Sequence, residues 1–200
     1  GERFANTDVT EQAKGYLPTT EFYNRIYGQK GWKAITIRSL SIGQGEILVT
    51  PLQLANQAAA IANKGYYITP HFNRNDSMKS DIHTTLVDSI HFDVVHRGME
   101  RVMTNGTGRW YNIPELQMCG KTGTVQNPHG EDHALFIGFA PKDNPQIAVA
   151  VAVENAGFGA TWACPMATLV MEQYLTGEIK RNALYERMVN ANLIDKSDEE

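Results

Sequence analysis

Gly120-Lys121-Thr122-Gly123-Thr124-Val125 follows a stretch rich in apolar residues (Leu116, Met118 and Cys119). A run that changes from apolar to small and cationic is typical of a strand that leaves the core and ends at an exposed edge. Such an edge suits contact with an anionic ligand, because a lysine ammonium and threonine hydroxyls donate hydrogen bonds. The pattern therefore predicts a strand over residues 116–125 whose second half carries a candidate functional site.

Two further strands are expected directly after it, Ala134 to Ala140 and Gln146 to Val153. The short segment from Pro141 to Pro145 between them favours an antiparallel hairpin. Valine and isoleucine alternate with alanine in the last strand, so both of its faces are apolar and both should be covered. The alanine face leaves room for a closely packed helix. Pro165 to Leu175 is the expected partner, with an apolar stripe of Met166, Leu169, Val170 and Tyr174.

Two helices are expected before these strands. The first begins after Thr50, a capping residue followed by proline, and ends before Gly65. The second runs from about Phe92 to Met103, and its apolar face is expected to consist of Val94, Val95, Met99 and Val102. Between the two helices, Tyr66 to Pro70 suggests a short strand and Asn73 to Ser80 a surface loop.

The two ends of the chain differ from this centre. Residues 1–47 are expected to be loop-rich, yet they contain enough aromatic side chains to dock onto another surface: Tyr16, Phe22, Tyr23, Tyr27 and Trp32. The main body is expected to span residues 48–176. Residues 177–200 should form a C-terminal helix, from Ile179 to Leu193, and a frayed tail.

Composition excludes some classes of function. The chain has 200 residues and a formal net charge of −4, whereas a nucleic-acid-binding domain normally shows a basic patch or stripe. The longest wholly apolar run, Ile147 to Val153, is far shorter than a membrane span. No signal-peptide pattern is visible at the start. Cys119 and Cys164 are expected to be two buried thiols, although the sequence alone also allows a disulfide.

Several blocks in a fixed order carry a resemblance to a known family. They are Gly15-Tyr16-Leu17-Pro18, Ser41-Ile42-Gly43-Gln44-Gly45, Val49-Thr50-Pro51-Leu52-Gln53-Leu54-Ala55, Ile61-Ala62-Asn63-Lys64-Gly65, Asp132-His133-Ala134-Leu135-Phe136 and Gly138-Phe139-Ala140-Pro141. Lys-Thr-Gly is a weak signal alone, but it is the third signature of serine β-lactamases and penicillin-binding proteins. Over residues 15–176 the chain resembles the class B penicillin-binding proteins, and within them the penicillin-binding protein 2 branch of elongation transpeptidases.

The resemblance implies an α/β fold of the α+β type, in which helices sandwich an antiparallel sheet, here incomplete. It implies a serine that attacks the penultimate D-Ala carbonyl of a peptidoglycan stem; an amine of a neighbouring stem then resolves the acyl-enzyme, and β-lactams acylate the same serine. Neither Ser-x-x-Lys nor the Ser-x-Asn-type second motif occurs in the chain. The chain is therefore expected to be part of a longer D,D-transpeptidase and to be inactive alone.

The same resemblance gives roles to the residues of the motif. Lys121 is expected to act catalytically, by aiding proton transfer at the absent second motif. Thr122 and Thr124 are expected to hydrogen-bond the terminal carboxylate of the substrate. Gly123 lets the substrate lie against the strand edge, and the Thr124 N–H is expected to be one donor of the oxyanion hole.

A polar cluster follows the motif. Asp132 and His133 match the family pattern and are expected in the wall of the cleft. A metal site that includes His129 is the less favoured alternative. No metal or other cofactor is expected, because no Cys or His spacing suggests zinc. Gly43 and Gly45 are expected to be turn residues in the cleft wall rather than a phosphate loop, since no Walker lysine follows.

The implied partners are peptidoglycan stem peptides, β-lactam antibiotics and the cell-elongation machinery. The implied location is the extracytoplasmic (periplasmic) face of the bacterial cytoplasmic membrane, with the anchor outside this chain. A serine β-lactamase and the division-specific class B paralogue are nearby alternatives, and the Gly-Gln-Gly and Thr-Pro-Leu-Gln-Leu-Ala blocks favour a transpeptidase over a β-lactamase. A third alternative is a non-catalytic scaffold that keeps the fold, which only residues upstream of Gly1 discriminate.

Overall fold

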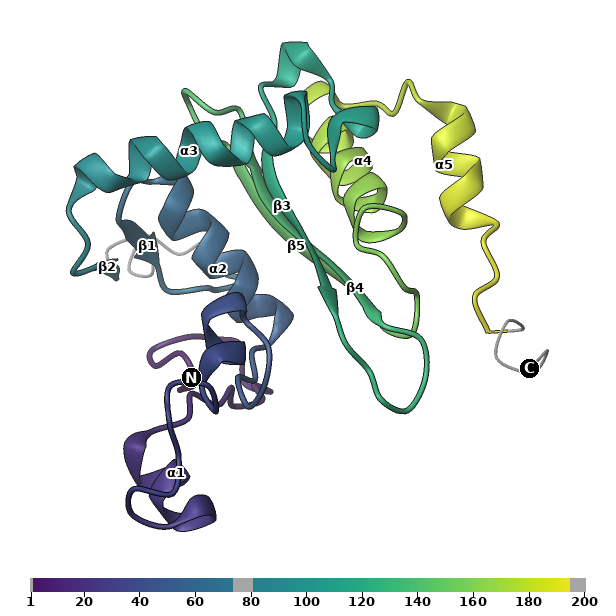
Figure 1. Cartoon of the computed structure of the whole chain (residues 1–200). Coiled ribbons are helices and arrows are strands. Elements are labelled where there is room, and N and C mark those ends of the chain that lie inside the picture. The colour runs from purple at the N-terminus through teal and green to yellow at the C-terminus, as the bar shows by residue number, and fades with distance from the viewer. Residues whose placement is uncertain (1, 74–80, 195–200) are drawn as a thin grey trace.

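The centre of the molecule is a three-stranded antiparallel sheet (Figure 1). The computed structural model describes residues 2–73 and 81–194. The strands are β3 (Cys119–Val125), β4 (His133–Ala140) and β5 (Ile147–Val153), in the spatial order β3-β4-β5. The three expected strands and their antiparallel pairing are thus confirmed.

The register of the sheet places the motif opposite apolar residues of the central strand. Lys121 lies opposite Ile137 of β4, which in turn lies opposite Ala150 of β5. The first strand begins later than expected, because Pro114–Leu116 forms a short 3-10 helix, η3. Gln117 follows with a positive φ of 46°, so the chain turns there before it enters the sheet.

Helices cover both faces of the sheet (Figure 1). α2 (Pro51–Ala62) and α3 (Ser89–Thr104) lie on one face, and α4 (Ala163–Thr176) lies on the other. α2 begins with a capping box, in which Thr50 Oγ1 accepts from the Gln53 N–H at 3.2 Å and Gln53 Oε1 accepts from the Thr50 N–H at 3.0 Å. The expected sandwich of helices around an antiparallel sheet is confirmed.

The core has one cluster on each side of the sheet. Phe136 belongs to the cluster under α4, and Phe139 to the cluster under α2 and α3; both are at most 1% exposed. Cys119 and Cys164 are free, buried thiols, and burial raises the pKa of each to about 12. The expectation of two buried thiols is therefore confirmed.

The expectation that the helix after β5 packs on the alanine face of that strand is wrong. The valine face of β5 shares a core with α4, in which Val149 and Met171 are buried. Ala148 on the other face packs beside Ala62 of α2. Both helices turn small residues toward the sheet, Ala62 on α2 and Ala163 and Ala167 on α4. A close approach is therefore possible on either face of β5, and the alanine face alone does not decide which helix covers it.

The expected apolar stripe of α4 is also only partly correct. The side that meets the sheet contains Ala163, Ala167 and Met171, all with no exposed surface, whereas Val170 is 50% exposed. α4 is apolar on more than one side, so the sequence periodicity predicted the side that faces away from the sheet. Together with α5 (Asn182–Val189), this outer side forms an apolar groove of about 560 Å³, lined by Ile147, Met166, Leu169, Val170, Gln173, Tyr174, Ile179, Tyr185, Met188 and Val189.

The buried face of α3 differs from the expected one in the same way. Phe92, His96, Met99 and Met103 are buried, whereas Val94 and Val95 are exposed. A histidine is tolerated in this stripe because His96 Nε2 lies 2.7 Å from the carbonyl oxygen of Ile61, within hydrogen-bond distance.

Smaller elements complete the fold. β1 (Tyr66–Ile68), which was expected, pairs antiparallel with β2 (Ile82–Thr84), which was not. The expected loop beyond Asn73 and the expected tail beyond residue 194 lie outside the described residues. α5 ends at Val189 and is shorter than expected. Within the described ranges, no helix is long and apolar enough to span a bilayer.

Residues 2–48, the N-terminal arm, contain one helix that the sequence did not predict, α1 (Thr20–Tyr27). A 3-10 helix, η1 (Arg38–Ile42), follows it. Figure 1 shows α1 at the far end of this arm, away from the sheet. The expected aromatic residues pack largely on one another: the rings of Tyr23 and Trp32 lie 5.3 Å apart.

Candidate active site

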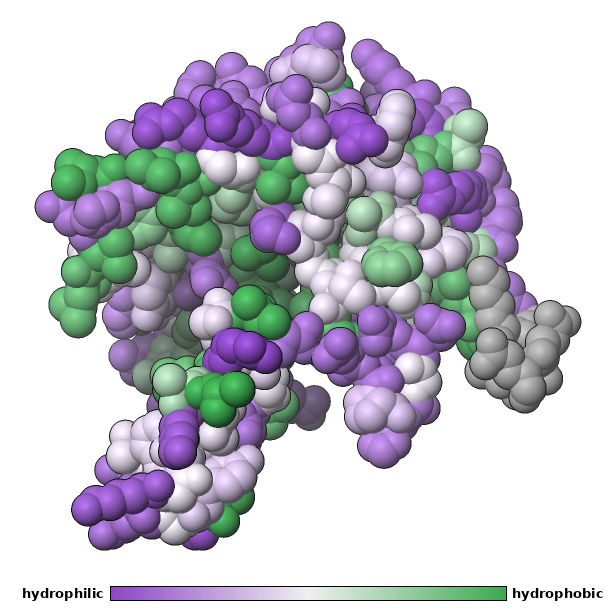
Figure 2. All heavy atoms as spheres, in the orientation of Figure 1, coloured by the Kyte–Doolittle hydropathy of each residue, from purple (hydrophilic) through white to green (hydrophobic). Residues whose placement is uncertain are grey.

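The lysine motif lies on the free edge of the sheet. β3 is an outer strand, and within residues 2–73 and 81–194 it pairs only with β4. Because side chains alternate along a strand, Lys121 shares the α2 and α3 face with Cys119, which packs against Met99 there. Lys121 itself is exposed. Figure 2 shows that the surface is hollowed between α3 and the N-terminal arm, on this side of the sheet.

Backbone groups of the motif also face the open edge. The Gln44 side-chain amide donates to the carbonyl oxygen of Thr124 at 3.0 Å, and the Lys121 ammonium donates to that of Thr122 at 2.6 Å. The N–H and C=O of one residue point to the same side of an antiparallel strand, and alternate residues share that side. The N–H groups of Thr122 and Thr124 therefore point outward too, away from β4. An extended peptide has donors and acceptors to pair with here.

The Thr122 hydroxyl has a partner from outside the sheet. Its Oγ1 lies 2.7 Å from Oγ1 of Thr107, which belongs to the turn after α3. The Lys121 ammonium is exposed and lies beside the same stretch of backbone. A cation and a hydroxyl thus lie next to the outward-facing N–H groups, an arrangement that suits a carboxylate.

Glycines let other segments approach the back of the motif. Gly159, in the turn between β5 and α4, donates its N–H to Thr124 Oγ1 at 3.4 Å. A Cβ on Gly159 would lie 2.1 Å from the carbonyl oxygen of Gly123 and 2.3 Å from that of Leu135. Only glycine fits there, so this turn supports β3 from the α4 side.

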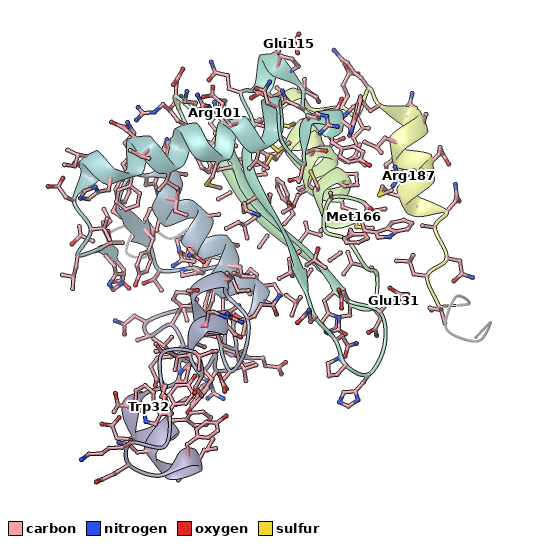
Figure 3. All side chains as sticks on the ribbon, viewed as in Figure 1. Trp32, Arg101, Glu115, Glu131, Met166 and Arg187 are labelled. Carbon is pink, nitrogen blue, oxygen red and sulfur yellow. The ribbon has the colours of Figure 1, made fainter. Side chains whose placement is uncertain are left out.

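Asp132 and His133 connect two turns at one end of the sheet. Asp132 Oδ1 accepts from the Asn127 N–H at 3.1 Å, and its carbonyl oxygen accepts from the Gly157 N–H at 2.7 Å. His133 Nδ1 accepts from the Asn155 N–H at 3.0 Å. These bonds join the β3–β4 loop to the β5–α4 turn; Glu131 marks the loop in Figure 3.

The polar cluster does not assemble into a metal site. Within the described ranges, no group of three or more His, Cys, Asp or Glu side chains is placed to hold a metal ion. The exposed His129 instead lines a pocket of about 540 Å³ beside the loop. Phe158, which is 71% exposed, and Trp162 also line this pocket.

Three residues at the motif were not predicted as site residues: Gln44, which the sequence marks only as part of the Gly-Gln-Gly block, Thr107 and Gly159. Gln44 lies between Gly43 and Gly45, which both have positive φ, and Thr107 lies between Gly106 and Gly108. Gly159 follows another glycine by two positions. A polar residue flanked by glycines is a usable signal, because such a turn presents one side chain from a fixed backbone.

Comparison with known proteins identifies the family. The family model "Penicillin binding protein transpeptidase domain" matches residues 6–172. The peptidoglycan D,D-transpeptidase MrdA of Acinetobacter baumannii is 34% identical, over 84% of this chain and 28% of that protein. Pseudomonas aeruginosa PBP2, solved in complex with WCK 5153, is 37% identical with a TM-score of 0.72, covering 86% of this chain and 40% of that one.

A third similar structure is the complex between PBP2 and MreC from Helicobacter pylori, at 25% identity and a TM-score of 0.74. It covers 86% of this chain and 33% of the other. The chain thus spans well under half the length of the relatives it matches. Because the family model covers most of the chain and the MrdA and PBP2 relatives match over 84% and 86% of it, the chain belongs to the penicillin-binding protein transpeptidase domain family and is of the PBP2/MrdA type.

Proposed function

We propose that this chain is the C-terminal part of the transpeptidase domain of a longer, serine-type peptidoglycan D,D-transpeptidase. The observation that carries the proposal is the edge at Thr122 and Thr124, where the Lys121 ammonium, threonine hydroxyls and outward-facing backbone N–H groups lie together. The nucleophilic serine lies in the missing part of the domain, so the chain alone is inactive. In this proposal, residues 48–176 form the part of the chain that belongs to the transpeptidase domain proper.

Each residue of the motif has a role in this proposal. Lys121 assists proton transfer between the serine and the second motif and supplies positive potential. Thr122 and Thr124 donate their hydroxyl hydrogens to the terminal carboxylate of the stem peptide. The outward Thr124 N–H is one donor to the oxyanion, and Gly123 keeps the edge free of a side chain. The Gly159 N–H supports this role, because it leaves the Thr124 hydroxyl hydrogen free to point elsewhere.

In this proposal, Asp132 and His133 fix the conformation of the β3–β4 loop. Both bond to the turn that contains Asn155 and Gly157, so they hold the β3–β4 loop as one wall of the cleft. We propose no metal and no other cofactor.

The relatives support the proposed setting of the longer protein. The H. pylori PBP2 was solved with MreC, which supports the cell-elongation machinery as a partner of the longer protein. Stem peptides as substrate, β-lactams as acylating inhibitors and a periplasmic position on the cytoplasmic membrane complete the proposal. The PBP2/MrdA matches favour the elongation branch over the division paralogue.

The decisive experiment is the intact mass of the longer protein, with its upstream segment present, after incubation with penicillin. A single stable adduct is expected. Rapid turnover of penicillin without a lasting adduct would instead indicate a β-lactamase, and no adduct on a folded protein would indicate a scaffold. The isolated chain is expected to form no adduct.

Lys121→Ala in the longer protein tests the role of the ammonium. The acylation rate constant is expected to fall at least about 100-fold, the lower end of the range for an acid–base group. Lys142→Ala is the matched control. Lys142 lies between β4 and β5 and pairs with Glu100 at 2.8 Å, away from the motif, so its loss should change acylation less than about twofold. Equal rates in both variants would contradict the proposed role.

A further inference from the structure

Thr107 is a polar residue that the proposed function does not use, yet it touches the motif. Its Oγ1 lies 2.7 Å from Oγ1 of Thr122, a normal O–H···O distance. The two residues are 15 positions apart and belong to different elements. The contact links the turn after α3 to the open edge of the sheet.

The turn that carries Thr107 is fixed on both sides. A Cβ on Gly106 would lie 2.8 Å from Cα of Val102, and one on Gly108 would lie 2.6 Å from Sδ of Met103. The Gly108 N–H also donates to the carbonyl oxygen of Val102 at 3.0 Å. Gly108 is buried, whereas Thr107 is exposed. The backbone of the turn therefore packs closely against the end of α3. The Thr107 side chain, between the two glycines, projects from it and contacts Thr122.

A hydroxyl has one hydrogen to donate and two lone pairs that accept. If the Thr107 hydroxyl donates to Thr122 Oγ1, the Thr122 hydrogen cannot point back at Thr107 and is free for another acceptor. The carboxylate that Thr122 is proposed to bind would be this acceptor. A chain of hydroxyls that ends on an anion is polarised along its length, which strengthens its last bond.

We propose that Thr107 is a positioning residue, which orients the Thr122 hydroxyl toward the terminal carboxylate of the substrate or of a β-lactam. This inference rests on the proposed function and deepens it, because it names which turn sets the recognition of the carboxylate. Thr107 touches Thr122 and acts on the ligand through it.

The test compares three variants of the longer protein with two probes. Thr107→Val keeps the shape and removes the hydroxyl; Thr107→Ser keeps the hydroxyl. Thr104→Val is the matched control, because Thr104 lies in the same segment and its hydroxyl donates to Asn105 Oδ1 at 2.9 Å instead. The probes are benzylpenicillin and its methyl ester, which lacks the carboxylate. The readout is the acylation rate against probe concentration, measured by intact mass.

For benzylpenicillin, Thr107→Val is expected to lower the second-order acylation constant about tenfold, the loss of roughly one charge-assisted hydrogen bond. The loss should lie in the half-saturating concentration, with the limiting rate nearly unchanged. For the methyl ester, Thr107→Val and the unaltered protein should react alike. Thr107→Ser and Thr104→Val should stay within about twofold of the unaltered protein with both probes.

Two results would overturn the inference while leaving the proposed function intact. One is an unaltered acylation constant for benzylpenicillin in Thr107→Val. The other is an equal loss for acid and ester, since a merely structural role does not depend on the carboxylate. If the unaltered protein is not acylated at all, the proposed function fails and the inference falls with it.

Discussion

In the sheet, a phenylalanine is fully buried on each face, Phe136 under α4 and Phe139 under α2 and α3. In the N-terminal arm, Tyr23 alone among residues 2–48 is buried. The arm is joined to the rest mainly by polar contacts: Gln44 donates to the Thr124 carbonyl, and the Asp8 carboxylate accepts from the Phe72 N–H at 2.8 Å. One edge-to-face ring contact, between Phe4 and Tyr67, adds to them. The body is stabilised by apolar burial and a backbone ladder, whereas the arm depends on a few side-chain contacts.

This difference bears on the candidate site, because both regions meet at the motif. The body supplies Lys121, Thr122 and Thr124 on a rigid strand, and the arm supplies Gln44. Contacts made by a weakly buried segment open at lower free energy than the core does. The arm side of the cleft is therefore expected to be the mobile side, and the strand the fixed one.

The largest expected effect is on the body. Phe136→Ala is expected to lower the free energy of unfolding of the chain by about 3–5 kcal/mol, because it removes a buried aromatic ring and leaves a cavity. Chemical denaturation measures the change. Phe158→Ala, a phenylalanine that is 71% exposed, should change it by less than about 0.5 kcal/mol. Similar losses in both variants would mean that the body is not a packed core.

A smaller effect is expected where the body supports the motif. Gly159→Ala is expected to lower the free energy of unfolding by about 1–3 kcal/mol, because the new Cβ meets the backbone of Gly123 and Leu135 at 2.1 and 2.3 Å. Denaturant midpoints and amide exchange in β3 are the measurements.

The matched control is a glycine with open space around it. Gly98 lies within α3, and a Cβ there meets nothing within 4 Å. Gly98→Ala is therefore expected to stabilise the chain by about 0.5–1 kcal/mol, because alanine loses less backbone entropy in a helix. Effects of the same sign at both glycines would contradict the proposed close packing behind the motif.

The body was also the easier region to predict from the sequence. β5 alternates valine with alanine, and a short proline-bounded segment precedes it, so local pattern was enough for the sheet. The helix faces were harder: α4 is apolar on two sides, and only the three-dimensional arrangement decides that Met171 meets the sheet while Val170 does not. The buried His96 of α3 was missed for a similar reason, because its partner is the distant Ile61 carbonyl.

The residues of the candidate site also differ in how easily the sequence predicts them. Lys121 to Thr124 were found because the motif is contiguous in the sequence. Gln44 and Thr107 were not, because their contacts join residues 80 and 15 positions apart. In the arm, α1 was missed because it has only 8 residues. Its apolar residues Phe22, Tyr23, Ile26 and Tyr27 do have helical spacing, and Thr19 caps its first turn.

The smallest expected effect concerns the arm alone and depends on pH. Burial, and then the hydrogen bond that Tyr23 donates to Glu46 at 2.8 Å, raise the pKa of Tyr23 to about 12. In the unfolded arm this phenol loses its proton near its ordinary pKa of about 10. The neutral phenol therefore stabilises the folded arm fully below pH 10, and the contribution is lost as the pH rises from about 10 to 12.

Fluorine NMR of 5-fluorotryptophan-labelled protein separates the regions, because Trp32 lies in the arm (Figure 3) while Trp110 and Trp162 lie in the body. The Trp32 signal is expected to change between pH 10 and 12 before the other two. Tyr23→Phe keeps the ring but has no phenol to ionise, so in that variant the early change of Trp32 should disappear. If all three signals change together in both proteins, the arm and the body unfold as one unit, and the distinction between a fixed and a mobile side of the cleft fails.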